Sequence, residues 1–430
     1  MTTSGAARQG AAQEDLNVSH IVVASLVGTT IEFYDFYIYG TAAALVIGQT
    51  FFPDSAPESQ ALKSFLTFGI AFLARPVGSI LFGHFGDRIG RKSTLVASML
   101  TMGLSTTLIG LLPGYAQAGV VAPWLLCLLR FGQGVGLGGE WGGAALLATE
   151  NAPQGRRAWF GMFPQLGPPL GFLLANGLFL LLLLGLGKGS FVAWAWRIPF
   201  LVSAALVAIG LYVRVSISET PAFRNAMARH ERVRAPLLDV LRYHWRPLIQ
   251  GSLSIVVCYA LFYMTTVFAL SYGVNDRRIE TTQFLGMLCI AVIFMAAATP
   301  ISAALADRFG RRPVLLASSL IAALLGLALP TLLGGGTFEI LLFLSLALAT
   351  MGLTFAPLGA LLPELFPVNV AYTGASSAYN LGGIIGASFA PTLAKVLLDR
   401  GGLAFVGYYI TAAAAISFLA VLSMRETQAA

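Results

Sequence analysis

The chain has few charged residues. Only 10% of its 430 residues are Asp, Glu, Lys or Arg, whereas 57% are hydrophobic. Ordinary soluble proteins carry about 25% charged residues, so this chain has too few to cover a water-facing surface. Most of its apolar runs reach about 18 residues, enough for a helix to cross a hydrocarbon core about 30 Å thick. It lacks the alternating segments of about ten residues that form an outer-membrane barrel. The sequence predicts an all-α membrane protein.

Residues typical of catalytic and metal sites are also scarce. The three cysteines lie within apolar runs, where they act as small hydrophobes, and they form neither a disulfide framework nor a zinc pattern. The four histidines fall in or beside expected loops, and neither a Walker loop nor a His-Glu-x-x-His motif is present. We therefore expect no cofactor and no metal, and a membrane enzyme is a remote alternative.

The net charge of +7 does not indicate a nucleic-acid partner. Basic residues gather in the short loops on one side of the expected membrane, the distribution that orients bacterial membrane proteins with those loops in the cytoplasm. No cleavable signal peptide is apparent, and the first 18 residues are small and polar. We expect a multi-pass protein of the bacterial inner membrane with both termini in the cytoplasm.

Twelve membrane spans are expected in two halves. The predicted spans are 20–48, 61–84, 94–112, 122–148, 158–187, 195–215, 249–272, 283–305, 314–333, 338–361, 372–398 and 403–424. The predicted domains are a tail over 1–19, a six-helix bundle over 20–215, a cytoplasmic linker over 216–248, a second bundle over 249–424 and a tail over 425–430.

The two halves contain matching loops. After the second span, the loop motif contains Gly83, Asp87, Arg88, Gly90 and Arg91. The equivalent positions after the eighth span, 220 residues later, include Asp307, Arg308 and Arg311. Glu150 after the fourth span is echoed by Glu364 after the tenth. Matching halves of six spans are typical of rocking transporters that bind cargo between their two repeats.

These loops resemble the signature of the major facilitator superfamily. A narrower resemblance is to its metabolite:proton symporter family, whose members carry citrate, 2-oxoglutarate, shikimate, proline or betaine. The segments that carry it are residues 31–36, 74–78, 130–134, 138–142, 218–221, 363–367 and 372–374. The resemblance implies two pseudo-symmetric six-helix bundles. Two departures are Ala303 in place of the loop glycine and Ala371 where relatives have a basic residue.

Five ionisable residues lie within apolar spans of the first half: Glu32, Asp35, Arg75, Arg130 and Glu140. An Arg or Asp at the centre of a membrane helix costs about 2.5–3.5 kcal/mol on insertion scales, so such residues indicate function. With a rise of about 1.5 Å per residue, Asp35 falls at the depth of Arg130, and Glu32 or Glu140 at that of Arg75.

Three acids against two bases leave one carboxylate to be protonated part of the time, as proton coupling requires. We predict that Asp35 or Glu32 carries the proton and that Arg130 meets a substrate carboxylate through its planar donor fork. The alternative is that all five residues form static internal pairs.

The spans of the second half contain one charged residue, Lys395, which can reach the outer surface. Candidate cargo contacts there are Tyr259, Tyr263, Tyr379 and Asn380, whose hydroxyl and amide groups can bind a polar solute. For each of these residues alone, ordinary helix packing is the alternative. In span four, the glycine-rich segment 132–143 predicts close helix contacts.

The matched loops are expected to act as gates. Asp87 and Asp307 can each place a carboxylate at a helix N-terminus. The loop arginines can bridge to Glu150, Glu219 or Glu364. Plain orientation by positive loops would explain the arginines but not the matched Asp and Gly positions.

Together these features predict proton-coupled symport of a small organic anion or zwitterion. The alternatives are antiport of a metabolite or drug, and an uncoupled uniporter or passive channel. The expected partners are a small-molecule substrate, protons and the lipid bilayer. We expect a monomer. Na⁺ is the alternative to H⁺ as the coupling ion.

Overall fold

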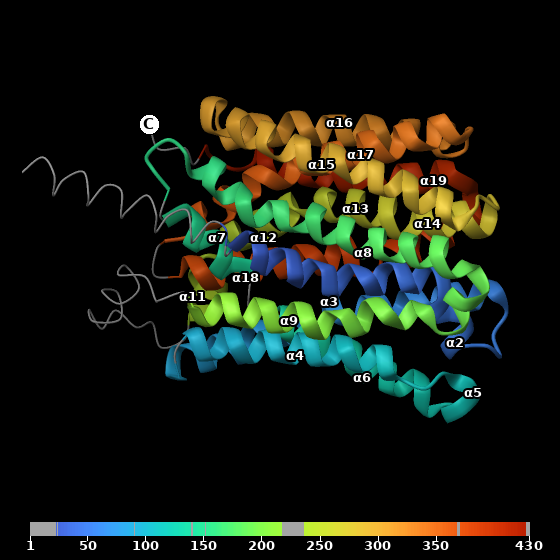
Figure 1. Cartoon of the computed structure of the whole chain (residues 1–430). Helices are drawn as coiled ribbons and strands as arrows, with labels where there is room; N and C mark the ends of the chain where they lie inside the picture. Colours follow the sequence, from blue (N-terminus) through green and yellow to red (C-terminus); the bar gives the residue numbers. More distant parts are fainter. Residues whose placement is uncertain are drawn as a thin grey trace, which may run out of the picture.

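The computed structural model describes residues 23, 25–89, 91–138, 141–150, 152–216, 236–367 and 370–426, leaving out the side chains of 57–58, 83–95, 147 and 213–216. This part of the chain is almost entirely helical. Its long helices run side by side between two ends of the molecule (Figure 1). The described chain ends at one of them, which we call the Asp307 face; α2 and α5 lie at the opposite face.

Six spans make up the first half. Span one covers residues 25–51 and ends in a π-helical turn, η1 (Ala43–Ile47), and α2 (Gly48–Phe51). The next five spans are α3 (Pro57–Ile89), α4 (Arg91–Leu111), α6 (Val121–Leu137) with α7 (Trp141–Glu150), α8 (Arg157–Ala193) and α9 (Ile198–Ser216). The short helices α5 (Tyr115–Ala118) and η2 (Ala195–Arg197) connect them.

The second half repeats this plan. Span seven combines α12 (Trp245–Ser254), α13 (Val256–Tyr263), η3 (Met264–Phe268), α14 (Ala269–Ser271) and η4 (Tyr272–Asp276). The following spans are α15 (Thr281–Phe309), α16 (Arg311–Leu333) and α17 (Thr337–Glu364). The last two spans are formed by α18 (Ala371–Gly383), η5 (Ile384–Ser388) and α19 (Ala390–Leu422). Gly401 and Gly402 break α19 in two, and the φ of +66° at Gly402 suits a residue without a side chain.

The twelve-helix prediction is confirmed, with span ends displaced by a few residues. Span seven begins at Trp245 rather than at 249, because the helix starts four residues before the apolar run. Most of the predicted linker lies outside the described residues. Its last part forms α11 (Pro236–Tyr243), which buries Val240 and exposes Leu238 and Leu241.

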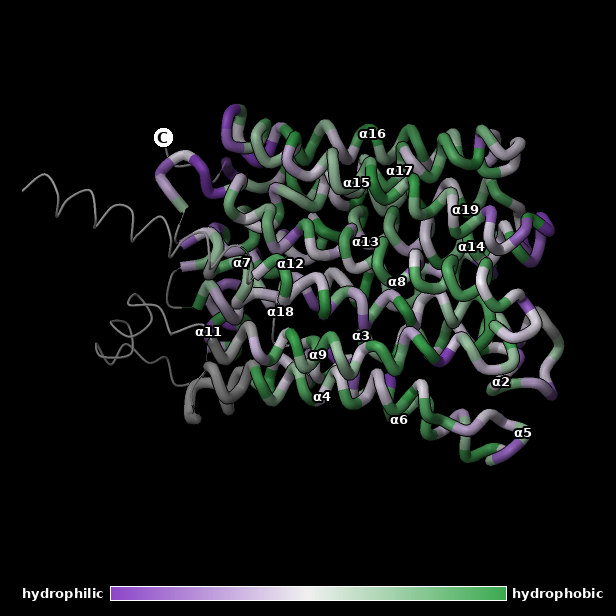
Figure 2. Tube along the Cα trace, in the orientation of Figure 1, coloured by the Kyte–Doolittle hydropathy of each residue, from purple (hydrophilic) through white to green (hydrophobic). Residues whose placement is uncertain are grey.

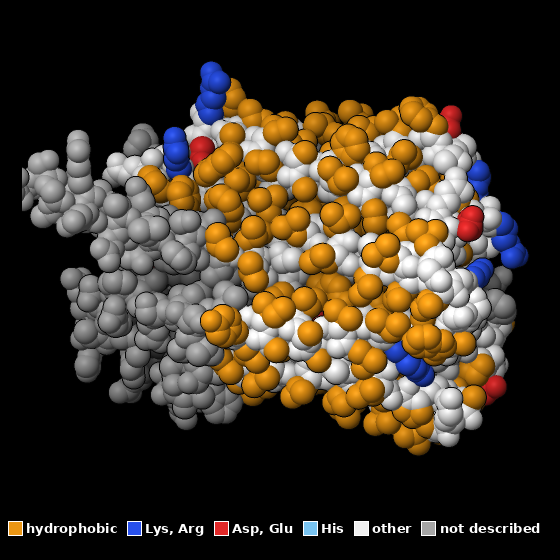
Figure 3. All heavy atoms as spheres, viewed as in Figure 1, with side chains coloured by type: hydrophobic (Ala, Val, Ile, Leu, Met, Phe, Trp, Pro, Cys, Tyr) orange, Lys and Arg blue, Asp and Glu red, His pale blue; other side chains and the backbone are white. Residues whose placement is uncertain are grey.

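The helices present apolar side chains outward. By length and composition, nine helical stretches of the described part are apolar enough to cross a membrane, and one of them, Ala371–Leu422, contains two spans. Figure 2 shows hydrophobic residues along the helices and hydrophilic ones near their ends. In Figure 3, hydrophobic side chains cover the middle of the visible face, with charged side chains toward its two ends. This surface suits a hydrocarbon environment.

Spans two and four approach each other very closely. A Cβ added to Gly78 would lie 1.9 Å from the Val135 carbonyl oxygen, and one on Gly134 would lie 2.1 Å from that of Ala71. Gly138 meets Arg75 in the same way, at 2.0 Å. The predicted close packing of the glycine-rich segment is therefore confirmed, and α3 and α6 touch through their backbones.

The two halves meet along several helix pairs. Span five, α8, packs against α15 of the second half, and α3 packs against α18 and η5. Gly161 of α8 and Gly359 of α17 also touch, since a Cβ on Gly359 would lie 2.5 Å from the Gly161 oxygen. Residues from both halves therefore face each other at the centre of the molecule.

We expect Gly134→Ala to lower the thermal stability of the purified protein and to abolish transport. The added methyl group overlaps the α3 backbone, so the helices must separate, at a cost of about 1–3 kcal/mol. Gly177→Ala in α8 is the matched control, because nothing lies within 4 Å of a Cβ there. Equal melting temperatures for the two variants in detergent would contradict the backbone contact.

Candidate functional site

Four of the five predicted membrane charges are buried together in the first half. Glu32, Asp35, Arg75 and Arg130 are at most 3% exposed. The Cζ atoms of Arg75 and Arg130 lie 4.7 and 5.3 Å from the centre of the Phe36 ring, so both guanidinium groups pack on span one. The fifth residue, Glu140, lies outside the described residues.

Arg130 is held by hydrogen bonds to its neighbours. Its Nε donates to the Thr67 carbonyl oxygen at 3.4 Å and its Nη2 to that of Phe68 at 3.1 Å. Its Nη1 donates to the Gln133 side-chain oxygen. The Tyr39 ring covers the group at 3.7 Å. All three nitrogens of this guanidinium group therefore have acceptors.

Gln133 links Arg130 to span one and span three. Its Nε2 donates to the backbone oxygen of Asp35 at 2.8 Å and to the Thr106 hydroxyl at 2.9 Å. This amide thus connects Arg130 to the backbone of span one, and the predicted pairing of the Asp35 carboxylate with Arg130 stays a prediction. Gln133 was not among the predicted site residues, although an amide one turn from a membrane arginine is a signal for a buried polar contact, and Gln133 is fully buried.

Arg75 has a different environment. Its Cζ lies 4.2 Å from the centre of the Phe72 ring, and this ring packs against Tyr259 and Tyr263 of the second half, with ring centres 6.1 and 5.4 Å away. Its Nε and Nη2 are buried without a hydrogen-bond partner among the described residues. Arg75 therefore lies beside the boundary between the halves with part of its donor capacity unused.

A small central cavity lies next to these charges. Its volume is about 10 Å³, roughly the space of one water molecule. The predicted residues Tyr259, Tyr263 and Tyr379 line it from the second half, and Phe33 and Tyr37 from the first. A metabolite is much larger, so the helices must move apart before one can bind.

The predicted residue Asn380 does not line this cavity. Its Nδ2 donates to the Ser79 hydroxyl at 2.7 Å and to the Gly138 oxygen at 3.0 Å, so it ties α18 to α3 and α6. Nearby, Trp141 stacks on Tyr379, with ring centres 4.0 Å apart and planes at 8°. These contacts join the halves between the cavity and the Asp307 face.

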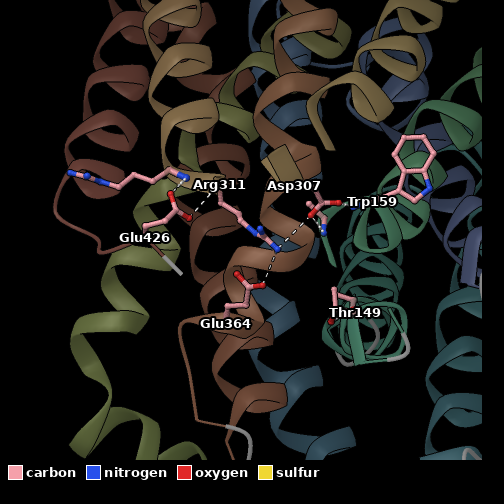
Figure 4. Close-up of polar contacts among 9 residues, drawn as sticks. Thr149, Trp159, Asp307, Arg311, Glu364 and Glu426 are labelled. Atoms are coloured by element: carbon pink, nitrogen blue, oxygen red, sulfur yellow. Dashed lines mark hydrogen bonds and ion pairs between the residues drawn. The ribbon is translucent and has the colours of Figure 1, made fainter. Parts of the chain in front are cut away.

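The second predicted gate motif holds the two halves together at the Asp307 face (Figure 4). Both carboxylate oxygens of Asp307 accept backbone hydrogen bonds at the start of α8, from Ala158 at 2.9 Å and Trp159 at 2.8 Å. Arg311 lies 3.6 Å from Asp307 and 3.3 Å from Glu364. A carboxylate of one half therefore caps a helix of the other.

Of the remaining predicted gate residues, the structure describes the side chains of Arg308 and Glu150. Arg308 is exposed and lies over the ring of its neighbour Phe309, and Glu150 is exposed as well. The side chains of the first motif lie outside the described residues: Gly83, Asp87, Arg88, Gly90 and Arg91.

Glu426 extends the cluster and was missed by the sequence analysis. Its two oxygens accept backbone hydrogen bonds from Arg311 and Arg312, each at 3.1 Å, at the N-terminus of α16 (Figure 4). Gly310 permits this contact, because its φ is +98° and a Cβ there would lie 2.6 Å from Glu426 Oε2. Glu426 belongs to the predicted C-terminal tail, where no pattern indicates a partner.

The helices and the buried charges define a membrane transporter, and comparison with known proteins places it in a family. The model of the "Sugar (and other) transporter" family matches residues 20–244, and that of the Major Facilitator Superfamily matches residues 286–429. The chain belongs to the major facilitator superfamily.

Its relatives are named as transporters. The inner membrane metabolite transport protein YhjE of Escherichia coli K12 is 51% identical over 95% of this chain and 94% of its own length. The shikimate transporter of the same strain is 35% identical, covering 94% of each chain. The proline/betaine transporter of Salmonella typhimurium LT2 is 31% identical over 96% of this chain and 85% of its own. The chain is accordingly an inner-membrane transporter rather than an enzyme, as the motifs predicted.

Solved structures show the same fold. The E. coli xylose transporter XylE, in a partially occluded inward-open conformation, matches with a TM-score of 0.74 at 19% identity, covering 96% of this chain and 99% of its own. XylE bound to 6-bromo-6-deoxy-D-glucose also matches with 0.74, at 17% identity and 95% coverage of each chain. The predicted pair of six-helix bundles is confirmed.

We expect Gln133→Leu to lower the stability of the protein by about 1–3 kcal/mol, because it leaves a buried arginine nitrogen without its acceptor. Thermal unfolding in detergent measures this loss. Gln49→Leu is the control, since the exposed Gln49 amide bonds only within its own helix. A melting temperature unchanged by Gln133→Leu would show that the amide does not hold Arg130.

Proposed function

We propose that the protein couples the uptake of a small organic anion or zwitterion to protons by alternating access. The observation that carries this proposal is the layer of two acids and two guanidinium groups buried beside the central cavity. Charges at this depth are costly and line ion or substrate pathways in membrane proteins. A buried carboxyl group can be charged in one state and neutral in another.

The relatives support this class of substrate. Two of them are named for shikimate and for proline and betaine, and each of these compounds has a carboxylate. The hydroxyl groups of Tyr259, Tyr263 and Tyr379 suit the polar remainder of such molecules. Proton coupling rests on Glu32 and Asp35 as candidate carriers, with Arg130 as their neighbour.

We further propose that the Asp307 face is cytoplasmic, with both termini there. Its loop carries Arg308, Arg311 and Arg312, in keeping with orientation by positive loops. Residues 20–215 and 249–424 are then the two moving bundles of a monomer. The capping of α8 by Asp307, with the Arg311–Glu364 pair, holds the cytoplasmic side shut while the site opens outward.

Antiport and uncoupled transport are the competing functions, and uptake into proteoliposomes separates them. Under symport, an imposed gradient with acid outside drives labelled shikimate, proline or glycine betaine above equilibrium, and an uncoupler abolishes the accumulation. Under antiport, added cargo moves protons in the opposite direction. A uniporter never exceeds equilibrium.

We expect Asp35→Asn to reduce gradient-driven accumulation to the level of empty liposomes while leaving exchange of labelled for unlabelled substrate intact. The amide cannot bind and release a proton, but the halves can still rock. Glu32→Gln tests the other candidate in the same assay.

Glu339→Gln is the control for removing a carboxylate, since Glu339 is exposed at the opposite face. Full accumulation in Glu32→Gln, Asp35→Asn and the double variant would contradict proton coupling through span one.

We expect Asp307→Ala to expose the cavity at the Asp307 face. Cys258 lines the cavity and is 1% exposed, so a maleimide added to inverted vesicles labels it slowly in a Cys127→Ala, Cys289→Ala background. Two hydrogen bonds to a charged carboxylate are lost, so labelling should accelerate by about tenfold or more. Asp399→Ala is the control, because Asp399 pairs with Lys395 within one half. Unchanged labelling in Asp307→Ala would contradict the gate.

A further inference from the structure

The two unused donors of Arg75 lie on one edge of its guanidinium group. Nε and Nη2 direct their N–H bonds in parallel, and this edge binds the two oxygens of a carboxylate in a bidentate manner. Arg75 is 1% exposed, and neither nitrogen has a hydrogen-bond partner among the described residues. Leaving buried charged donors unpaired is costly, which indicates an acceptor that arrives from outside.

The surroundings of this edge belong to the central cavity. Arg75 packs on the Phe72 ring, which contacts the rings of Tyr259 and Tyr263, and both tyrosines line the cavity. The Tyr259 hydroxyl is itself buried without a well-formed hydrogen bond in the described structure, although the Tyr379 hydroxyl lies near it. The Arg75 guanidinium group of the first half and the Tyr259 hydroxyl of the second half thus both offer donors beside the central cavity.

Two other cations of the described spans, Arg130 and Lys395, already have acceptors. Every nitrogen of Arg130 already donates to Thr67, Phe68 or Gln133. Lys395 pairs with Asp276 at 3.2 Å and with Asp399 at 3.4 Å, in the opposite-face part of the second half. Of the two guanidinium groups that pack on Phe36, Arg75 therefore keeps its Nε–Nη2 edge without a partner among the described residues, whereas the same edge of Arg130 binds the Thr67 and Phe68 carbonyl oxygens.

We infer that Arg75, rather than Arg130, binds the substrate carboxylate, and that the site selects compounds with a single carboxylate over di- and tricarboxylates. The bound carboxylate accepts two parallel hydrogen bonds from Nε and Nη2, with the Tyr259 hydroxyl as a further donor. The aromatic lining then packs against the compact body of the substrate. This inference rests on the proposed function as a metabolite transporter, but it does not depend on proton coupling.

Equilibrium binding to the purified full-length protein in detergent tests the inference without any ion gradient. The probes are matched pairs that differ in the carboxylate: shikimate and its methyl ester, glycine betaine and choline, proline and prolinamide. Citrate and 2-oxoglutarate test the selection against further carboxylates. We expect at least one monocarboxylate to raise the melting temperature, its partner lacking the carboxylate to have no effect, and both polycarboxylates to bind at least about tenfold more weakly.

Arg75→Lys keeps the charge but removes the parallel donor pair, and should weaken binding of the monocarboxylate roughly 10- to 100-fold. Tyr259→Phe should weaken it about several-fold. Arg197→Lys is the control for an arginine-to-lysine exchange, because Arg197 packs on Trp196 near the opposite face, and its binding should equal that of the wild type.

Three results would overturn the inference: no monocarboxylate binds, a polycarboxylate binds more tightly, or Arg75→Lys binds like the wild type. If Arg75→Lys does not fold, Tyr259→Phe and the matched probes on the wild-type protein still decide the question. A further explanation is a static pair between Arg75 and Glu140, and Glu140→Gln tests it. This pair predicts that Arg75→Lys and Glu140→Gln lose the same stability, and that binding does not depend on the carboxylate of the probe. If the protein binds monocarboxylates in this pattern but shows no uphill uptake, only the proposed proton coupling is refuted.

Discussion

The backbone contact between α3 and α6 determines where the buried charges lie. Gly78, Gly134 and Gly138 bring the two helices so close that a methyl group at any of them would overlap a carbonyl of the facing helix. At this separation, Arg130 of α6 can reach the Thr67 and Phe68 carbonyl oxygens of α3. The arginine is thereby solvated by backbone rather than by water, which offsets the cost of burying its charge in the membrane.

The same contact places a second guanidinium group beside the first. Arg75 and Arg130 both pack on Phe36, so two like charges share one side of span one, whose Glu32 and Asp35 supply the opposite charge. Arg130 donates its hydrogen bonds within the first half, whereas Arg75 packs on Phe72 next to Tyr259 and Tyr263 of the second half. One cation thus joins the packed helices, whereas the other keeps two buried nitrogens without a hydrogen-bond partner among the described residues.

The sequence predicted the spans and the buried charges well, because long apolar runs and rare intramembrane charges are local signals. It did not predict which arginine keeps free donors, since that depends on the rotation of each helix and on carbonyl groups of its neighbour. Glu426 was missed because its partners, Arg311 and Arg312, are distant in the sequence. Gln133 lies one turn from Arg130, but its bonds to Asp35 and Thr106 also join residues distant in the sequence. Asn380 was a candidate for cargo binding with helix packing as the alternative, and its amide donates to Ser79 and Gly138. Spacing along one helix cannot reveal such partners.

Helix α17 offers a physical link between the cavity and the Asp307 face. It carries Met351 and Phe355 at the cavity and Glu364 at its far end, where Glu364 meets Arg311. Because helices move largely as rigid bodies, a ligand that pushes the cavity end of α17 also shifts Glu364 relative to the Arg311–Asp307 pair. Asp307 caps the N-terminus of α8, so a shift of Glu364 changes the charges that surround this cap. Occupation of the cavity and release of this face would therefore be coupled through one helix, without a separate signalling element.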